Sequence, residues 1–229
     1  MRRVFAFLVL AGTALALAGG GLVSAQKDKE KADASPEKEF LPKDDAEKKI
    51  LAVLDDLDKN HRPGHFNVPV EDGRLLRILT ESSGAKHVVE IGTSNGYSGI
   101  WFCLALRQTG GKLTTHEIDA KRAAEARDNF KRAGVDQLVT IVEGDAHETV
   151  KKLKDPIDLL FLDADPKGYL DYMEKIGRLV KPGGLIVTHN VNRPAPDPEW
   201  IKRITTSPEL NTVFLNMHAA GIAVSLKRK

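Results

Sequence analysis

The sequence predicts an α/β fold with a doubly wound, mostly parallel sheet of seven strands, the last two forming an antiparallel pair. From residue 84 onward, short apolar runs alternate with helical patterns, as in chains built from βαβ units. The alternation stops near the C-terminus, where two strand patterns flank a short Gly-containing connection. With 41% hydrophobic and 29% charged residues and a single cysteine, the composition is that of a globular domain without disulfides.

The first 25 residues differ in kind from the rest of the chain. Arg2 and Arg3 precede an apolar run that continues to about Val23, and small residues follow up to Ala25. This order predicts a signal peptide over residues 1–25, and the arginine pair partly resembles a twin-arginine export signal. We therefore expect an exported protein, periplasmic or secreted. The alternative is an uncleaved segment that anchors the chain to the membrane.

Residues 26–43 are rich in Lys, Glu, Asp, Ala and Pro and have almost no large apolar side chains. Such a composition buries too little apolar surface to fold, so it predicts a disordered linker. The folded domain is then expected over residues 44–229. Basic and acidic residues are interleaved and the net charge is +2, so no nucleic-acid partner is expected.

The spacing of apolar residues predicts the helices and strands of the domain. Leucine and isoleucine residues at helical spacing predict one helix from Asp44 and another over residues 70–80. Further helices are expected to begin near Gly96, Ala120, Ala146 and Gly168. The expected strands are residues 87–91, 112–117, 138–142, 158–162, 185–188, 212–215 and 222–226.

The loop after the first strand carries the main functional signal. It has the order E-x-G-x-x-x-G from Glu90 through Gly92 to Gly96, at the strand end where doubly wound sheets bind ligands. A dinucleotide loop would carry its second glycine at Ser94. The carboxylate of Glu90 would repel a pyrophosphate but suits a cationic amino-acid group. The loop therefore favours S-adenosylmethionine (SAM), and a nicotinamide-dependent reductase is a distant alternative.

Two further acidic positions agree with this interpretation. Glu117 ends the next expected strand, where a carboxylate can accept hydrogen bonds from both hydroxyls of a ribose. Asp145 and Ala146 follow the third expected strand, in the place where SAM-dependent enzymes hold the adenine.

Several segments of the domain resemble the small class I SAM-dependent O-methyltransferases typified by catechol and caffeoyl-CoA O-methyltransferase. The resemblance extends from about Asn67 to the C-terminus and implies their Rossmann-like fold, with five parallel strands closed by an antiparallel pair. The segments that carry it are residues 66–68, 72–76, 90–98, 161–165, 169–170 and 179–186.

This resemblance implies roles for individual residues around the cofactor. Val68 would lie near the methionine part of SAM, and Glu90 and Ser98 would bind its polar end. Gly92 and Thr93 would allow close backbone approach, and Glu117 would hold the ribose. Asp145 and Ala146 would line the adenine pocket, and Asp163 would lie beside the sulfonium and a metal.

The expected metal site departs from the family pattern. Family members hold a divalent ion, which orients two neighbouring substrate oxygens, with two aspartates and an asparagine. Here Asp163 and Asn190 stand at the outer positions, and His189 stands where the second aspartate is expected. Magnesium prefers oxygen ligands, whereas imidazole suits zinc, iron, nickel or manganese. Either the metal changes, or its affinity falls, or no metal binds.

The catalytic base departs from the pattern as well. A lysine commonly follows the fourth-strand aspartate by three residues, but here Pro166 has that place and Lys167 comes one residue later. His189 is the other candidate base, because an unperturbed imidazole titrates near neutral pH. Three interpretations stay open: a softer or weaker metal site, a metal-free site with His189 or Lys167 as base, and a site that binds cofactor without catalysis.

The expected function is methyl transfer from SAM to an oxygen of a small, catechol-like acceptor. The alternative is an exported protein that binds SAM or S-adenosylhomocysteine (SAH) without turnover. The acceptor side is expected to be built from loops, chiefly residues 191–200, where Trp200 either stacks on the acceptor or packs in the core. The oligomeric state is left open, with a homodimer as one option because dimers are frequent among the relatives that the sequence resembles.

Overall fold

The structure is a computed structural model that describes residues 41–194 and 196–229. The predicted signal peptide and residues 26–40 of the predicted linker lie outside the described residues. Helix α2 (Asp45–Asn60) begins at the expected domain start, with the Asp44 side chain accepting the N–H of Glu47 as its N-cap. Within the described ranges, no helix is long and apolar enough to cross a bilayer.

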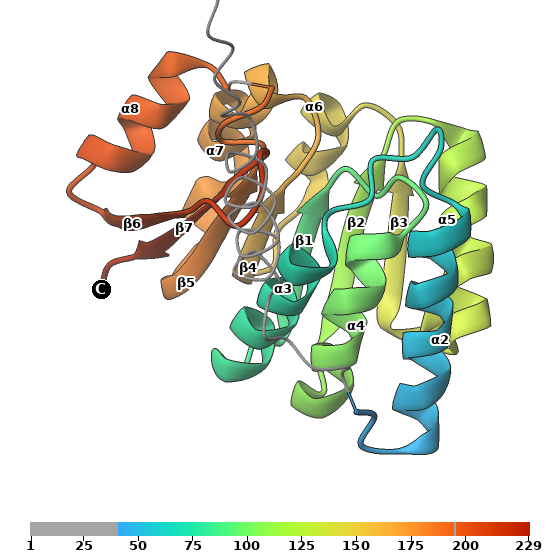
Figure 1. The fold of residues 1–229 in the computed structure, drawn as a ribbon. Coiled ribbons are helices and arrows are strands. Elements are labelled where there is room, and N and C mark those ends of the chain that lie inside the picture. Colours follow the sequence, from blue (N-terminus) through green and yellow to red (C-terminus); the bar gives the residue numbers. More distant parts are fainter. Residues whose placement is uncertain (1–40, 195) are drawn as a thin grey trace, which may run out of the picture. The chain divides into compact units, whose positions relative to one another are not determined.

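Among the described residues, seven strands form one mixed sheet in the order β3-β2-β1-β4-β5-β7-β6 (Figure 1). The strands β1 to β5 pair in parallel, and β7 pairs antiparallel with both β5 and β6. This arrangement confirms the predicted fold class. The strands are β1 (His87–Ile91), β2 (Lys112–Glu117), β3 (Val139–Glu143), β4 (Ile157–Leu162), β5 (Val180–His189), β6 (Leu210–Leu215) and β7 (Ile222–Lys227).

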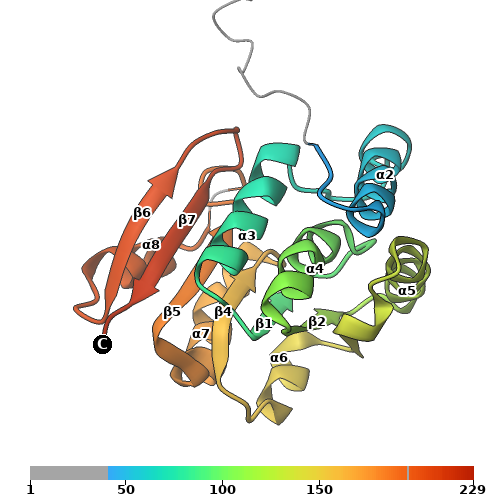
Figure 2. The same ribbon diagram turned by 90° about the horizontal axis from the view of Figure 1, so that it is seen from below.

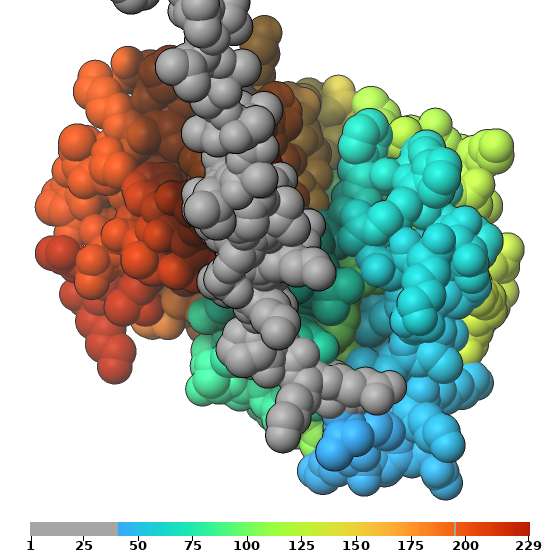
Figure 3. Space-filling view, viewed as in Figure 1, coloured from blue at the N-terminus to red at the C-terminus, as the bar shows by residue number. Residues whose placement is uncertain are grey.

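Helices cover both faces of the sheet (Figure 2). One hydrophobic core joins the sheet to α2, α3, α4 and α5, and a second joins it to the turns and helices on the other face, including α7 and α8. In the space-filling view, α2 and the loop after it (blue to cyan) lie on one side of the visible face, and α8 with β6 (orange to red) on the other (Figure 3).

The remaining helices and 3₁₀ turns are α3 (Val70–Ser82), α4 (Tyr97–Thr109), α5 (Ala120–Ala133), η1 (Asp136–Leu138), α6 (Ala146–Thr149), η2 (Val150–Lys152), η3 (Pro166–Gly168), α7 (Tyr169–Ile176), η4 (Gly177–Leu179) and α8 (Pro198–Thr206).

Alternation along the central strands divides their side chains between the two cores. In β1, Val88 packs into the core with α4, and Val89 packs into the core with α7. Both valines are fully buried, which is why the sequence of this strand is apolar on both faces. Cys103 of α4 is likewise buried, in agreement with its apolar surroundings in the sequence.

Two elements differ from the sequence-based expectations. Strand β5 begins at Val180 rather than at residue 185, so it includes the Lys-Pro-Gly-Gly segment. Residues 198–206, partly expected as an acceptor-side loop, form α8, with Asp197 as N-cap and Pro198 in the first turn. Trp200 is fully buried on this helix and packs edge-to-face on Tyr169, with ring centroids 6.0 Å apart. Its role is therefore core packing.

Candidate functional site

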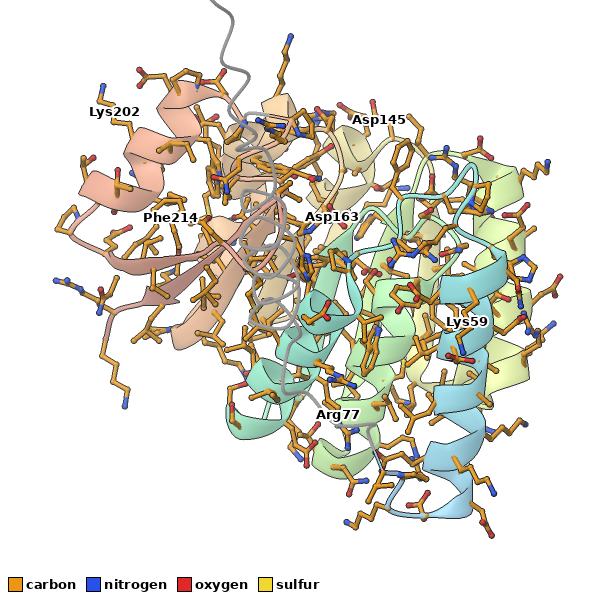
Figure 4. All side chains as sticks on the ribbon, in the orientation of Figure 1. Lys59, Arg77, Asp145, Asp163, Lys202 and Phe214 are labelled. Atoms are coloured by element: carbon orange, nitrogen blue, oxygen red, sulfur yellow. The ribbon has the colours of Figure 1, made fainter. Side chains whose placement is uncertain are left out.

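A cavity of about 740 Å³ lies at the carboxyl ends of the parallel strands. This volume is within the range of roughly 300–1,000 Å³ that is typical of small-molecule sites. Figure 4 shows Asp145 and Asp163 at this edge of the sheet. The predicted cofactor residues that line the cavity are Val68, Gly92, Thr93, Ser98, Glu117, Asp145, Ala146 and Asp163.

Glu90, at the end of β1, is buried behind the cavity wall. Its two oxygens accept hydrogen bonds from Ser98 Oγ at 2.5 Å and from Thr115 Oγ1 at 2.6 Å. Thr93 Oγ1 lies 2.6 Å from Thr115 Oγ1, so the Thr93 side chain belongs to this network. Burial raises the pKa of Glu90 to about 8, and the two hydroxyl hydrogen bonds oppose that rise. A positive charge nearby would favour the ionised form of this carboxyl.

The turn after β1 brings backbone groups to Glu117. Gly92 has a φ of +105°, and a Cβ there would lie 2.4 Å from the carbonyl oxygen of Asp163, so the close approach of two strand ends requires this glycine. The N–H groups of Ser94 and Asp119 donate to the two carboxylate oxygens of Glu117, at 2.7 and 3.0 Å. Because a carboxylate has about four acceptor positions, Glu117 can also accept two hydroxyls from the cavity.

The rim of the cavity has apolar side chains next to Asp145. Asp145 is the N-cap of α6, and Ala146 lines the cavity beside it. Phe66 and Ile118 also line the cavity, although they are 77% and 71% exposed. The Arg122 guanidinium lies 5.5 Å from the centroid of the Phe66 ring. Exposed apolar surface next to an acceptor carboxylate suits a flat, polar-edged ring such as a nucleobase.

His147 belongs to a polar cluster that the sequence did not predict. Its Nδ1 lies 2.5 Å from Asp171 Oδ2, and its Nε2 lies 3.2 Å from the hydroxyl of Tyr172. The Tyr172 hydroxyl donates to Asp165 Oδ1 at 2.8 Å, and the His147 and Tyr172 rings stack with centroids 4.5 Å apart. The hydrogen bond to Asp171 raises the pKa of His147.

His189, at the end of β5, is held between two acidic side chains. Its Nδ1 lies 3.0 Å from Asp163 Oδ1, and its Nε2 lies 3.1 Å from Asp72 Oδ2. Asn190, with φ of +59°, donates its amide to the same Asp163 oxygen at 3.1 Å. Burial lowers the pKa of His189, but the charges and hydrogen bonds of Asp163 and Asp72 outweigh it and raise this pKa to about 10. Burial also raises the pKa of Asp163, and both ring nitrogens of His189 have a carboxylate partner in this arrangement.

The arrangement around His189 does not fit the expected divalent metal. The residues expected as ligands, Asp163, His189 and Asn190, do lie together at the cavity. However, a ligating imidazole needs one nitrogen lone pair free of hydrogen, and both nitrogens of His189 face carboxylates. Among the residues that the structure describes, no group of three or more His, Cys, Asp or Glu side chains is arranged to hold a metal ion.

The structure does not bring Lys167 to the cavity. Lys167 lies in η3 and is exposed, whereas the preceding Pro166 lines the cavity. The insertion of Pro166 at the position that carries lysine in the family moves the amine out of the site. Neither residue proposed as a base therefore has the geometry for that role.

Asp72 is the site residue that sequence analysis left without a role. Asp72, Leu75, Leu76 and Leu79 follow the i, i+3, i+4, i+7 spacing of one helix face. The spacing alone predicts that Asp72 points inward, and it is 2% exposed. A carboxylate on the buried face of a helix needs a partner, so this signal was available in the sequence even though the identity of the partner was not.

Comparison with known proteins identifies the family and agrees with the fold. A family model described as O-methyltransferase matches residues 43–194. The chain belongs to the O-methyltransferase family.

Individual relatives extend this result. A catechol O-methyltransferase from Niastella koreensis is 38% identical over 148 residues, which are 63% of this chain and 66% of that protein. A Mycobacterium avium relative is 40% identical over 119 residues, so the match spans 53% of that protein and 51% of this chain. An O-methyltransferase from Bacillus cereus, solved in complex with SAH, has a TM-score of 0.68 and 26% identity and covers 89% of this chain and 97% of its own. The chain thus aligns with about half to two thirds of the length of these curated relatives.

Proposed function

We propose that this chain transfers a methyl group from SAM to an oxygen of a small-molecule acceptor. The observation that carries the proposal is a set of acidic side chains at the ends of four successive parallel strands around one cavity. Glu90 is the last residue but one of β1, Glu117 ends β2, Asp145 follows β3 and Asp163 follows β4. SAM has two cationic groups, an ammonium and a sulfonium, and this arrangement suits both.

Each group has a distinct part in holding the cofactor. The carboxyl of Glu90, hydrogen-bonded by Ser98, would become ionised when the methionine ammonium group binds near it. Glu117 has acceptor positions for the ribose hydroxyls, and Asp145 lies beside the apolar rim that suits the adenine. SAM supplies an activated methyl group and leaves as SAH. The acceptor gives up its hydroxyl proton to solvent as it binds, and the protein aligns the acceptor oxygen with the methyl group. Membership of the O-methyltransferase family and the SAH complex of the Bacillus cereus neighbour support this assignment.

The acceptor that we propose is a small hydroxyl compound of the phenol or catechol class. The catechol O-methyltransferase from Niastella koreensis supports a catechol-like acceptor. The acceptor would enter beside Asp163 and His189, where Pro194 and Ala220 complete the cavity.

The first test is cofactor binding by calorimetry with SAM, SAH and NAD. We expect SAM and SAH to bind, and Glu117→Gln to weaken SAM binding about 10- to 100-fold, because it removes a charged acceptor for two hydroxyls. Glu143→Gln is the matched control. Glu143 pairs in register with Glu117 on β3 but is exposed, bonded to Arg127 and outside the cavity lining.

The second test is methyl transfer. Purified full-length chain with methyl-labelled SAM and a panel of phenols and catechols should give a labelled methyl ether. Binding of NAD in preference to SAM, or equal SAM affinities for Glu117→Gln and Glu143→Gln, would contradict the proposed function.

A further inference from the structure

His116 lines the cavity one residue before Glu117, although its side chain is only 1% exposed. It pairs in register with Ile91, which packs into the core on the α7 face of the sheet. Because successive side chains of a strand point to opposite faces, the imidazole of His116 and the carboxylate of Glu117 lie on different faces of the sheet. The two residues therefore reach the cavity from different sides.

The two ring nitrogens of His116 differ in their partners. Nδ1 lies 2.8 Å from Oγ1 of Thr149, the last residue of α6. Nε2 is shielded from solvent, and no group of the described residues forms a hydrogen bond with it. A buried polar atom without a partner costs free energy, and such atoms are rare in folded proteins. Nε2 is thus the polar atom of this ring that is left for a ligand.

Burial determines the form in which His116 meets a ligand. It lowers the pKa of His116 to about 4, so the ring is neutral at physiological pH. One nitrogen of a neutral imidazole donates a hydrogen bond and the other accepts one. The Thr149 hydroxyl can take either part toward Nδ1, so Nε2 can present either an N–H group or a lone pair to a ligand.

The other two histidines of the cavity wall do not share this property. Among the described residues, His116, His147 and His189 line the cavity. His147 has Asp171 at Nδ1 and the Tyr172 hydroxyl at Nε2, and His189 has a carboxylate at each nitrogen. A ligand therefore finds an unpartnered imidazole nitrogen in this wall at His116.

The place of His116 in the sheet points to the cofactor and not to the acceptor. Strand β2 lies between β3 and β1, whereas β4 and β5, which lead to the acceptor end, lie on the other side of β1. The next residue, Glu117, is the proposed ribose acceptor. Thr149, which contacts the His116 ring, belongs to the helix that Asp145 caps at the adenine rim. The ring of His116 is therefore at the adenine end of the cavity.

On the basis of the proposed function, we propose that His116 recognises the adenine ring of the cofactor through a hydrogen bond at Nε2. Adenine carries its exocyclic amine, a donor, next to ring nitrogens that accept. A neutral imidazole can match either kind of atom. His116 is thus a specificity-determining residue for the base, in addition to the carboxylates at this edge of the sheet.

Nitrogen spectroscopy tests the contact without relying on activity. In full-length protein with ¹⁵N-labelled histidine, saturating SAH should move the Nε2 signal of His116. Methylthioadenosine, which has the base but no amino-acid part, should move it in the same way, and methylthioribose, which has no base, should leave it in place. His87 is the internal control, because its ring nitrogens are bonded to Pro156 and Thr114 and it lies outside the cavity lining.

Two substitutions separate the polar atom from the space that it fills. His116→Leu keeps an apolar side chain in the wall and removes Nε2, so we expect it to weaken SAH binding about 5- to 50-fold in calorimetry. His116→Gln carries an amide near the place of Nε2 and should bind SAH within about threefold of the wild type. His87→Leu makes the same change in the neighbouring strand and should alter the Kd by less than about twofold.

Urea unfolding without ligand checks that the variants are folded. His116→Leu should be at least as stable as His116→Gln, because no protein group loses a hydrogen bond at Nε2. A wild type that binds SAH with an unchanged Nε2 signal, or a His116→Leu variant with the wild-type Kd, would overturn the inference alone. Failure of the wild type to bind SAH would contradict the proposed function, and the inference with it.

Discussion

At the scale of single residues, the carboxyl groups of the site differ because their surroundings differ. Glu90 has no contact with solvent and only two hydroxyl donors, so its pKa rises to about 8. Glu117 accepts two backbone N–H groups at the cavity edge, and Asp163 shares a hydrogen bond with the His189 ring. Side chains of the same type therefore differ in their protonation and in the hydrogen-bond donors that they accept.

The raised pKa of Glu90 predicts a specific pH dependence of stability. Between its ordinary pKa of 4.5 and its folded pKa of about 8, the folded chain keeps a proton that the unfolded chain has lost. This contribution to stability is complete below pH 4.5 and is lost as the pH rises through 8. Glu90→Gln keeps the shape of the protonated group and removes this titration. We expect its stability advantage over the wild type to grow by on the order of 1–4 kcal/mol between about pH 5 and pH 8.5.

Urea unfolding of both proteins at the two pH values measures this difference. The comparison cancels the carboxyl groups that the two chains share. Parallel pH profiles would show that Glu90 is ionised in the free protein. The same variant should bind SAM more weakly, because a neutral amide cannot replace the carboxylate that faces the ammonium group.

At the scale of elements, the site depends on how α3 packs across the sheet. The spacing of leucines predicts α3, and the alternation of apolar residues predicts strands β1 to β4, since both patterns are local. The start of β5 was less predictable, because its Lys-Pro-Gly-Gly segment has the composition of a turn. This segment lies at a register shift, between the pair Ile157–Val180 and the pair Leu159–Leu185. Helix α8 was missed because it has only nine residues and begins after a proline-rich stretch.

The contact between α3 and α4 predicts the cost of adding one methyl group. Gly73→Ala would place its Cβ 2.3 Å from Trp101 Nε1. Although alanine favours a helix by about 1 kcal/mol over glycine, overpacking of this kind costs more, so we expect a net loss of about 1–3 kcal/mol. Urea unfolding measures the loss. Ile78→Ala on the same helix is the control, because Ile78 is 60% exposed and its replacement should change stability by less than about 0.5 kcal/mol.

The Gly73→Ala variant also tests the link between packing and the active site. A shift of α3 moves Asp72 and should alter the ring signals of His189. An alanine variant as stable as the wild type, with unchanged ring signals, would show that Trp101 can move aside without cost.

At the scale of the whole molecule, apolar cores cover both faces of the sheet. The polar side chains of the site therefore lie at the edge formed by the carboxyl ends of the strands. The cavity is built there from residues that range from Phe66 to Ala220 in the sequence. For residues 1–25 we propose a signal peptide that directs export and is removed after Ala25.

Processing of the N-terminus gives a measurable prediction. Expression of the full-length chain in a Gram-negative host should release a periplasmic product whose intact mass corresponds to a start at Gln26. Replacement of Ala25 by a large residue such as leucine should block cleavage and retain the chain in the membrane fraction. A wild-type chain that stays uncleaved in that fraction would support the membrane-anchored alternative.

The sequence by itself determined the sheet, its closing strand pair and the acidic positions at the ends of its strands. These features depend on local periodicity and on the rule that parallel strands present their carboxyl ends at one edge. The resemblance to the small O-methyltransferases also grouped Asp163, His189 and Asn190 at one expected site.

Only the tertiary structure decided what those residues do. Asp72 and His189 are 117 positions apart in the sequence, and no local pattern links them. Their contact arises from the packing of α3 on α4, which brings a second buried carboxylate to the imidazole. A buried titratable group takes its properties from the groups around it, so the hydrogen-bond partners of both ring nitrogens of His189 are set by the fold.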